Sequence, residues 1–239
     1  MKAKLFTLGL GMLAWAGINA QTVLYEQNFE SSGVIPTDIT LINADGFVAF
    51  DEEDAVFNDS AWIVGTTSRV ELQGTKIAIA CSYYAGYAVP ADDWMILPSI
   101  SLDGASKLYW DAMSLTSSGN YPDEYQVLVA PSADGVTPTV AYFEENGMQL
   151  FQVLEESSAA VSNPGAGLQH RMLALSDSGF ANTPVWIAFR LITGGDGGPY
   201  IGIDNIKVET TVSVAEVNSP KINIYPNPEI GRASCRERV

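Results

Sequence analysis

Short segments rich in aromatic and β-branched residues, separated by turn-forming clusters, constrain this chain more than any other feature. About eleven such segments follow one another, among them "KIAIACSYY" (76–84), "KLYWDAMSL" (107–115) and "PVWIAFRLIT" (184–193). Turn-formers such as "SSGNYPD", "SADGVTP" and "GGDGGP" stand between them. No window longer than about ten residues carries an apolar stripe with the period of a helix. The pattern predicts an all-β fold with almost no helix, a jelly-roll β-sandwich of two sheets.

Alternation within the segments predicts which side chains are buried. The odd-numbered residues from Val185 to Leu191 share one face of their segment, and the residues between them point the other way. Trp94 and Trp110 stand in apolar runs, so we expect them to pack in the core rather than to form ligand platforms. Cys81 alternates with Ala and Ile, which favours a buried thiol over a nucleophile.

The two ends of the chain differ from its middle. Residues 1–20 carry two lysines and then an apolar run, which is typical of a secretory signal peptide cut before Gln21. Residues 229–239, "EIGRASCRERV", concentrate arginines after a sharp change of composition, and they resemble the in-frame translation of a common sequencing adapter. We therefore expect this tail not to be of natural origin. Cys81 is then the only native cysteine, so no internal disulfide is expected.

The formal net charge is −16 at pH 7. Such an excess of acids opposes binding to nucleic acid and to anionic membranes, and it is compatible with cation binding. Apart from the signal peptide, no stretch is long and apolar enough to cross a bilayer. We expect a secreted or cell-surface protein with no nucleic-acid partner and no membrane insertion.

One apolar segment matches a known pattern. In "ADDWMILPSISL" (91–102), Asp92, Asp93 and Trp94 precede Pro98 and "ISL". This resembles the "DDW-[LI]-x-x-P-x-[IL]-x-L" motif of cleaved-adhesin, or choice-of-anchor J, domains, which include the adhesin modules attached to gingipain-type proteases. Further fragments come in the order of that family: "LYEQNFES", "IPTDITLINADG", "AWIVG", "LYWDAMS", "PDEYQVLVA", "VWIAFRL" and "IDNIKV".

The resemblance covers nearly the whole mature chain, and we place the adhesin-like domain at 21–210. It implies a jelly-roll sandwich, similar to galactose-binding and MAM-like domains, that binds a partner and does not catalyse a reaction. It also implies export to a cell surface or matrix. After a linker at 211–218, "KINIYPNP" resembles the first strand of a type IX secretion sorting domain, truncated here at 219–228. This second likeness implies the type IX secretion machinery as a partner.

Calcium is the cofactor that the resemblance implies. In similar jelly rolls the first strand, an acidic loop and the last strand bring their acids together, and the corresponding residues here are Glu30, Asp45 and Asp204. The first and last strands are often neighbours, which would place Glu30 near Asp204. The alternative is that Asp45 only shapes a turn and Asp204 only ends a strand. Asp59 is a reserve ligand, and the acid run 51–59 around it is expected to be a solvated loop.

A ligand surface would use exposed aromatic side chains on the connecting segments, because sugar rings stack on flat π faces. Tyr87, Tyr121 and Tyr200 are the candidate ligand-binding residues. The alternative is that these tyrosines cover the edge of the sandwich. Tyr83 and Tyr84 are adjacent, so alternation sends one of them into the core.

The chain offers little for catalysis. Its single histidine, His170, has no recognisable nucleophile nearby in sequence and is expected to be a strand-edge residue. Paired carboxylates for glycoside hydrolysis stay open, because their spacing through the fold is not visible in the sequence. The sequence predicts a secreted, non-enzymatic, adhesin-like module that binds an extracellular protein or a glycan. The alternatives are a jelly-roll glycoside hydrolase and a structural spacer in a larger surface protein.

Overall fold

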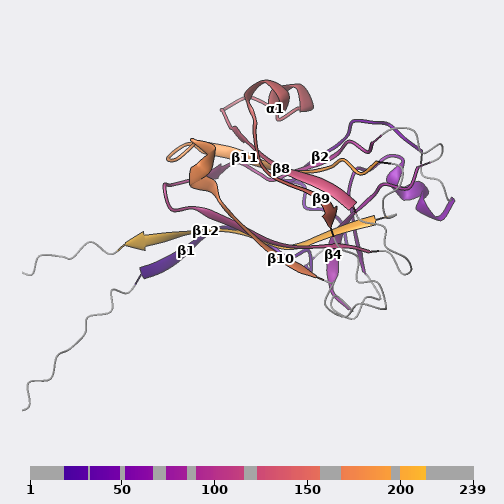
Figure 1. Ribbon diagram of the computed structural model, residues 1–239, viewed down its shortest axis with the longest axis horizontal. Coiled ribbons are helices and arrows are strands. Elements are labelled where there is room, and N and C mark those ends of the chain that lie inside the picture. Colours follow the sequence, from indigo (N-terminus) through magenta and orange to yellow (C-terminus); the bar gives the residue numbers. More distant parts are fainter. Residues whose placement is uncertain are drawn as a thin grey trace, which may run out of the picture. The chain divides into compact units, whose positions relative to one another are not determined.

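Two antiparallel six-stranded sheets pack face to face in the computed structural model (Figure 1). The structure describes residues 19–31, 33–48, 52–66, 74–84, 90–115, 123–156, 168–194 and 200–213. Residues 1–18 of the predicted signal peptide, the sorting-domain strand, the tail and the linker beyond Ser213 lie outside the described residues, and Asn19 and Ala20 begin β1. The prediction of a jelly-roll β-sandwich with almost no helix is confirmed.

The first sheet, called the β12 sheet, has the strand order β10-β7-β12-β4-β3, and β1 also pairs with β12. Its strands are β1 (Asn19–Gln27), β3 (Ile63–Thr66), β4 (Lys76–Cys81), β7 (Lys107–Ser114), β10 (Gln169–Ala174) and β12 (Tyr200–Ser213). The last strand therefore continues past the predicted domain boundary at 210.

The second sheet, called the β11 sheet, has the order β2-β5-β11-β8-β9, and β6 also pairs with β11. Its strands are β2 (Thr40–Asn43), β5 (Asp93–Ile96), β6 (Ile100–Ser101), β8 (Asp123–Pro131), β9 (Met148–Glu156) and β11 (Pro184–Leu191). The described helical segments are the α-helix α1 (Val140–Asn146) and two short 3-10 turns, η1 (Glu52–Phe57) and η3 (Leu175–Ser178). Within the described residues, no helix is both long and apolar enough to cross a membrane.

Strand alternation builds the central core. On β11, Val185, Ile187, Phe189 and Leu191 are fully buried between the sheets, as their spacing predicts. The opposite face of β11 carries Trp186, Ala188 and Arg190 and is turned away from the central core. Burial of this branched and aromatic surface is the main stabilising term for a sandwich of this kind.

Both tryptophans that the sequence assigns to the core are buried, but in different places. Trp110 lies in the central cluster, where its Nε1 donates to the Tyr125 hydroxyl at 2.9 Å. Trp94 is on the other face of β5 and packs against Phe143, with ring centroids 5.4 Å apart. The prediction that Trp94 is a buried packing residue is confirmed, but its core cluster lies on the outer face of the β11 sheet and not between the sheets. The residue is buried because α1 and its neighbours cover the outer face.

The helix α1 forms where the sequence supplies a cap at each end. Thr139 is the N-cap, and its Oγ1 accepts from the Tyr142 backbone N–H at 3.1 Å. At the other end the Gly147 N–H donates to the Phe143 carbonyl at 2.8 Å. The helix is too short for a visible apolar stripe, yet it covers one end of the outer face of the β11 sheet (Figure 1).

The outer face of the β12 sheet also carries an apolar cluster. Cys81, Ile77 and Met113 are buried there under Phe57 of η1. The prediction of a buried Cys81 thiol is confirmed. The acid run 51–59 is more than a solvated loop, because η1 turns Phe57 inward from it.

The strand β12 pairs with β7 in both of its halves, and its first half also pairs with β4. The strand β1 pairs with β12 as well. A register shift between Asp204 and Lys207 interrupts the pairing with β7, and Asn205 adopts a left-handed φ of 48° there. The prediction that the first and last strands are neighbours is confirmed.

Candidate functional site

A buried carboxylate ties together the end of the sandwich from which several connections leave. Asp123 is fully buried, and it accepts hydrogen bonds from Ser82 Oγ at 3.0 Å, Ser114 Oγ at 2.6 Å and Thr193 Oγ1 at 3.2 Å. These partners follow β4, end β7 and follow β11. Asp123 therefore holds together, at one end of the sandwich, the described residues next to the connections that follow β4, β7 and β11.

One of the three predicted ligand-binding tyrosines, Tyr200, belongs to the described residues. Tyr87 and Tyr121 lie outside them, so their role stays a prediction. Tyr200 begins β12 opposite Cys81 and packs against Phe57, with ring centroids 5.9 Å apart. It is partly buried, as the alternative of an edge-covering tyrosine anticipates. Of the adjacent pair, Tyr84 is in the core, and the prediction that one of the two is buried is confirmed.

Two of the predicted calcium ligands influence each other electrostatically. Asp204 is only 3 % exposed. Burial is the main cause that raises the pKa of Asp204 to about 6, a hydrogen bond from the Asn205 backbone opposes this, and the charges of Asp111 and Glu30 add to it. Glu30 Oε1 accepts from the Lys76 backbone N–H at 3.1 Å. The charge of Glu30 therefore acts on the buried carboxylate of Asp204.

Asp45 belongs to a different neighbourhood. Its two carboxylate oxygens accept from the Asp92 N–H at 2.6 Å and the Phe47 N–H at 2.7 Å. Gly46 beside it has a φ of +65°, so this segment is a turn, as the alternative interpretation of Asp45 states. The reserve ligand Asp59 is exposed in the turn after η1. Within the described residues, no group of three or more His, Cys, Asp or Glu side chains is suited to hold a metal ion.

A histidine–carboxylate contact on the β12 sheet was not anticipated from the sequence. On the edge strand β10, His170 is exposed, and its Nδ1 lies 2.5 Å from Asp111 Oδ1 on β7. Asn205 Nδ2 donates to the other oxygen of Asp111 at 2.9 Å. Asp111 in turn lies opposite Asp204 in the β7–β12 register. The prediction of His170 as a strand-edge residue is confirmed, and the neighbouring acid pair is a new observation.

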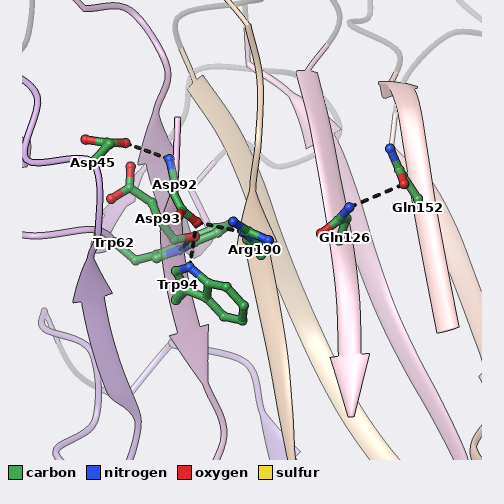
Figure 2. A network of polar contacts seen from close by, with 8 residues as sticks. All are labelled: Asp45, Trp62, Asp92, Asp93, Trp94, Gln126, Gln152 and Arg190. Carbon is green, nitrogen blue, oxygen red and sulfur yellow. Dashed lines mark hydrogen bonds and ion pairs between the residues drawn. The ribbon is translucent and has the colours of Figure 1, made fainter. Parts of the chain in front are cut away.

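The "DDW" segment forms a polar network on the outer face of the β11 sheet (Figure 2). Asp92 Oδ1 accepts from Trp94 Nε1 and from Arg190 Nε, each at 2.6 Å. The Arg190 guanidinium carbon lies 4.6 Å from the centre of the Trp94 ring. One carboxylate and one aromatic face thus hold a single guanidinium in place.

Asp93 points the other way from the same strand and is almost fully buried. Its Oδ2 accepts from the Tyr84 hydroxyl at 2.6 Å, and its Oδ1 has no hydrogen-bond partner. Burial raises the pKa of Asp93 to about 8, the Tyr84 hydrogen bond opposes this, and the charges of Asp45 and Asp92 add to it. The Asp93 carboxyl is therefore mostly protonated at neutral pH, which lowers the cost of burying it.

Amide side chains continue the network across the sheet. Arg190 lies opposite Trp94 on β5 and opposite Gln126 on β8, and Gln126 lies opposite Gln152 on β9. Gln152 Oε1 accepts from Gln126 Nε2 at 3.3 Å and from Gln149 Nε2 at 2.8 Å. We call these four side chains the polar row: Arg190, Gln126, Gln152 and Gln149. Figure 2 shows Arg190 between Asp92 and Gln126, with Gln152 on the next strand.

The fold is similar to that of cleaved adhesin domains. Three such domains of Lys-gingipain from Porphyromonas gingivalis align with TM-scores of 0.53, 0.52 and 0.51, at 18 %, 18 % and 19 % sequence identity. Each alignment covers 79 % of this chain and 97 %, 99 % and 97 % of the respective domain. No protein-family model matches the chain, and no curated protein matches it by sequence. The likeness supports the gingipain-type adhesin fold that the "DDW" motif implies.

Proposed function

We propose that this chain is a secreted, non-enzymatic, adhesin-like module that binds an extracellular protein or a glycan. The polar row carries the proposal. It places hydrogen-bonding side chains on four positions of rigid, paired strands, and Asp92 and Trp94 fix the orientation of its arginine. Groups that are ordered before a ligand arrives lose little entropy on binding, which favours recognition. The similarity to adhesin domains supports the same function class.

A binding screen tests the proposal. The soluble chain is applied to a glycan array and to immobilised matrix proteins, beside a variant in which Gln126 and Gln152 are both changed to Ala. We expect a saturable signal from the natural chain that the variant weakens. A chain that binds neither class of ligand would be a structural spacer, and the proposal would be rejected.

Calcium at Glu30 and Asp204 is a further part of the proposal. The buried Asp204 carboxylate lies near the negative charges of Asp111 and Glu30, and a cation would relieve their repulsion. Asp45 is not included, because its two carboxylate oxygens accept from the backbone N–H groups of Phe47 and Asp92. We expect a chelator to lower the melting temperature of the natural chain and to leave that of an Asp204→Ala variant unchanged. If the chelator does not change the melting temperature of the natural chain, calcium binding is contradicted.

One observation favours a second candidate function, glycoside hydrolysis. Asp204 faces Asp111 in register, and the raised pKa of Asp204 suits a general acid beside a second carboxyl group. Incubation with polysaccharides followed by a reducing-sugar assay separates this candidate from a binding module. Sugar release that disappears in an Asp204→Asn variant would make the chain an enzyme, whereas binding without release supports the first proposal.

A further inference from the structure

We propose that the polar row binds a neutral, unbranched glycan chain laid across strands β11, β8 and β9. The proposal rests on the function proposed above and names the ligand class for that same surface. It differs from the sequence-based expectation, which assigned ligand binding to tyrosines on the connecting segments.

The geometry of the row suits an extended ligand. Arg190, Gln126 and Gln152 are register partners on three neighbouring strands, so their side chains form a line across the sheet. Neighbouring strands lie about 4.8 Å apart, which is comparable with the length of one sugar unit in an extended chain. Successive side chains of the row can therefore meet successive sugar units.

The hydrogen bonds within the row leave its remaining polar atoms oriented for a ligand. Gln152 Oε1 is used by two amide donors, which orients Gln126 and Gln149. Within the described residues, Gln126 Oε1, Gln149 Oε1 and Gln152 Nε2 have no protein partner. The row thus offers both acceptors and a donor, and a sugar hydroxyl needs one of each.

The arginine adds directed donors without adding net charge. Arg190 Nε is used by Asp92, and the guanidinium lies over the Trp94 ring. Its terminal nitrogens make no further hydrogen bond within the described residues. They can therefore donate to neighbouring sugar hydroxyls from a fixed plane.

Charge selects a neutral glycan over an acidic one. The Arg190–Asp92 pair is balanced, and the other three members of the row are uncharged amides. Glu124 is two residues from Gln126 on the same strand, and the whole chain has a formal charge of −16. An anionic polysaccharide would be repelled by these acids, whereas a neutral one would not.

The row has no exposed aromatic platform, which sets the kind of binding to expect. Trp94 is fully buried beneath Arg190, so a sugar ring cannot stack on it. Hydrogen bonds to the amides and the guanidinium must therefore supply the affinity. A single amide bond contributes little net free energy in water, so the affinity of one site is modest and sensitive to each member of the row.

Affinity electrophoresis of the full chain tests the proposal. The gels contain neutral unbranched polysaccharides (β-1,4-mannan, β-1,4-galactan or xylan) or the acidic polygalacturonate, and the dissociation constant is taken from the retardation. We expect at least one neutral polysaccharide to retard the chain and polygalacturonate to leave it unretarded. Changing both Gln126 and Gln152 to Ala should weaken the neutral binding by roughly tenfold, and Gln152→Ala alone by roughly three- to tenfold.

The matched control is Gln21→Ala. Gln21 is an exposed glutamine on the other sheet that donates to Glu209, so its loss tests for general effects of amide removal. We expect Gln21→Ala to bind like the natural chain, and all variants to keep the natural melting temperature within a few degrees. Since the row residues are on the surface, Gln152→Ala keeps the test valid even if the double variant unfolds.

The possible results separate this inference from the proposed function. Neutral binding that the row variants do not change, or binding to polygalacturonate alone, would overturn the inference and leave a glycan-binding module. Binding to a matrix protein with no glycan retardation would overturn the inference and support the other class of partner. Binding to neither class would overturn both.

Discussion

Acidic residues have different partners on the outer faces of the two sheets. On the β11 sheet, the charge of Asp92 is paired with Arg190 and bonded by Trp94. On the β12 sheet, Asp204 lies opposite Asp111, and within the described residues no lysine or arginine forms an ion pair with it. The first arrangement makes a neutral, ordered surface. The second keeps like charges close together at some cost in stability.

This difference indicates that the two faces suit different ligands. A paired and rigid surface gives directed hydrogen bonds that change little with pH or salt. A group of neighbouring acids responds to protons and cations, because either one lowers the repulsion between its members. The chain thus separates a surface suited to recognition from a surface suited to charge-dependent stabilisation. Three substitutions test this separation.

Trp94→Ala should have the largest effect on stability. The ring is fully buried, packs on Phe143 and supports the guanidinium of Arg190. We expect the free energy of unfolding to fall by about 3–5 kcal/mol, measured by urea denaturation. Arg190→Ala is the comparison variant, and since it keeps the ring, its loss should be below about 2 kcal/mol. If both variants lose the same free energy of unfolding, the Trp94 ring does not support the polar row.

Asp93→Asn should have the next largest effect, and it depends on pH. The pKa of Asp93 is raised from 3.8 to about 8, so the folded state keeps its proton where the unfolded state has lost it. The stabilising contribution is complete below about pH 4 and is lost as the pH rises towards 8. We expect Asp93→Asn to be more stable than the natural chain at pH 8, by roughly 2–4 kcal/mol, and to lose this advantage near pH 4.

Chemical denaturation at several pH values measures this effect. Asp134→Asn, at an exposed position in a turn, is the matched control, and its pH profile should follow that of the natural chain. A natural chain whose stability does not change between pH 4 and 8 would contradict a protonated, buried Asp93. If Asp93→Asn follows the natural chain at every pH, then of the two carboxyls compared here only Asp204 on the β12 sheet makes the stability depend on pH.

The fold was predictable because its determinants are local. Strand alternation, as in Val185 to Leu191, and turn-forming clusters are written in consecutive residues, and they correctly predict two stacked sheets. The side of β5 on which Trp94 is buried was not predictable. It depends on α1, whose capped turn around Thr139 is too short to show a helical period.

The candidate site was much less predictable, because it depends on register. Gln126, Gln152 and Arg190 are separated widely in sequence, and only the pairing of β11, β8 and β9 brings them into line. The same holds for Asp111, which meets Asp204 through the β7–β12 register. The influence of Glu30 on Asp204 could be expected because first and last strands are common neighbours. The bond from the Asp92 N–H to Asp45 could not, since the two residues are far apart in the sequence.

Asp204→Asn should give the smallest of the three effects and tests the outer face of the β12 sheet directly. The pKa of Asp204 is raised from 3.8 to about 6, chiefly by burial. Its stabilising contribution is therefore complete below about pH 4 and is lost as the pH rises through 6. With a chelator present, we expect the variant to be more stable than the natural chain at pH 7 by about 1 kcal/mol, after allowance for solvent screening.

Calcium sharpens this last comparison, because it should act on only one of the two proteins. If a cation relieves the repulsion between Asp204, Glu30 and Asp111, added calcium raises the melting temperature of the natural chain and removes the advantage of the variant. Asp134→Asn removes the same formal charge from an exposed turn and should respond to calcium like the natural chain. If the stability of Asp204→Asn varies with pH in the same way as that of the natural chain, the charge of Asp204 is as well compensated as that of Asp92. The two outer faces would then not differ in the way described.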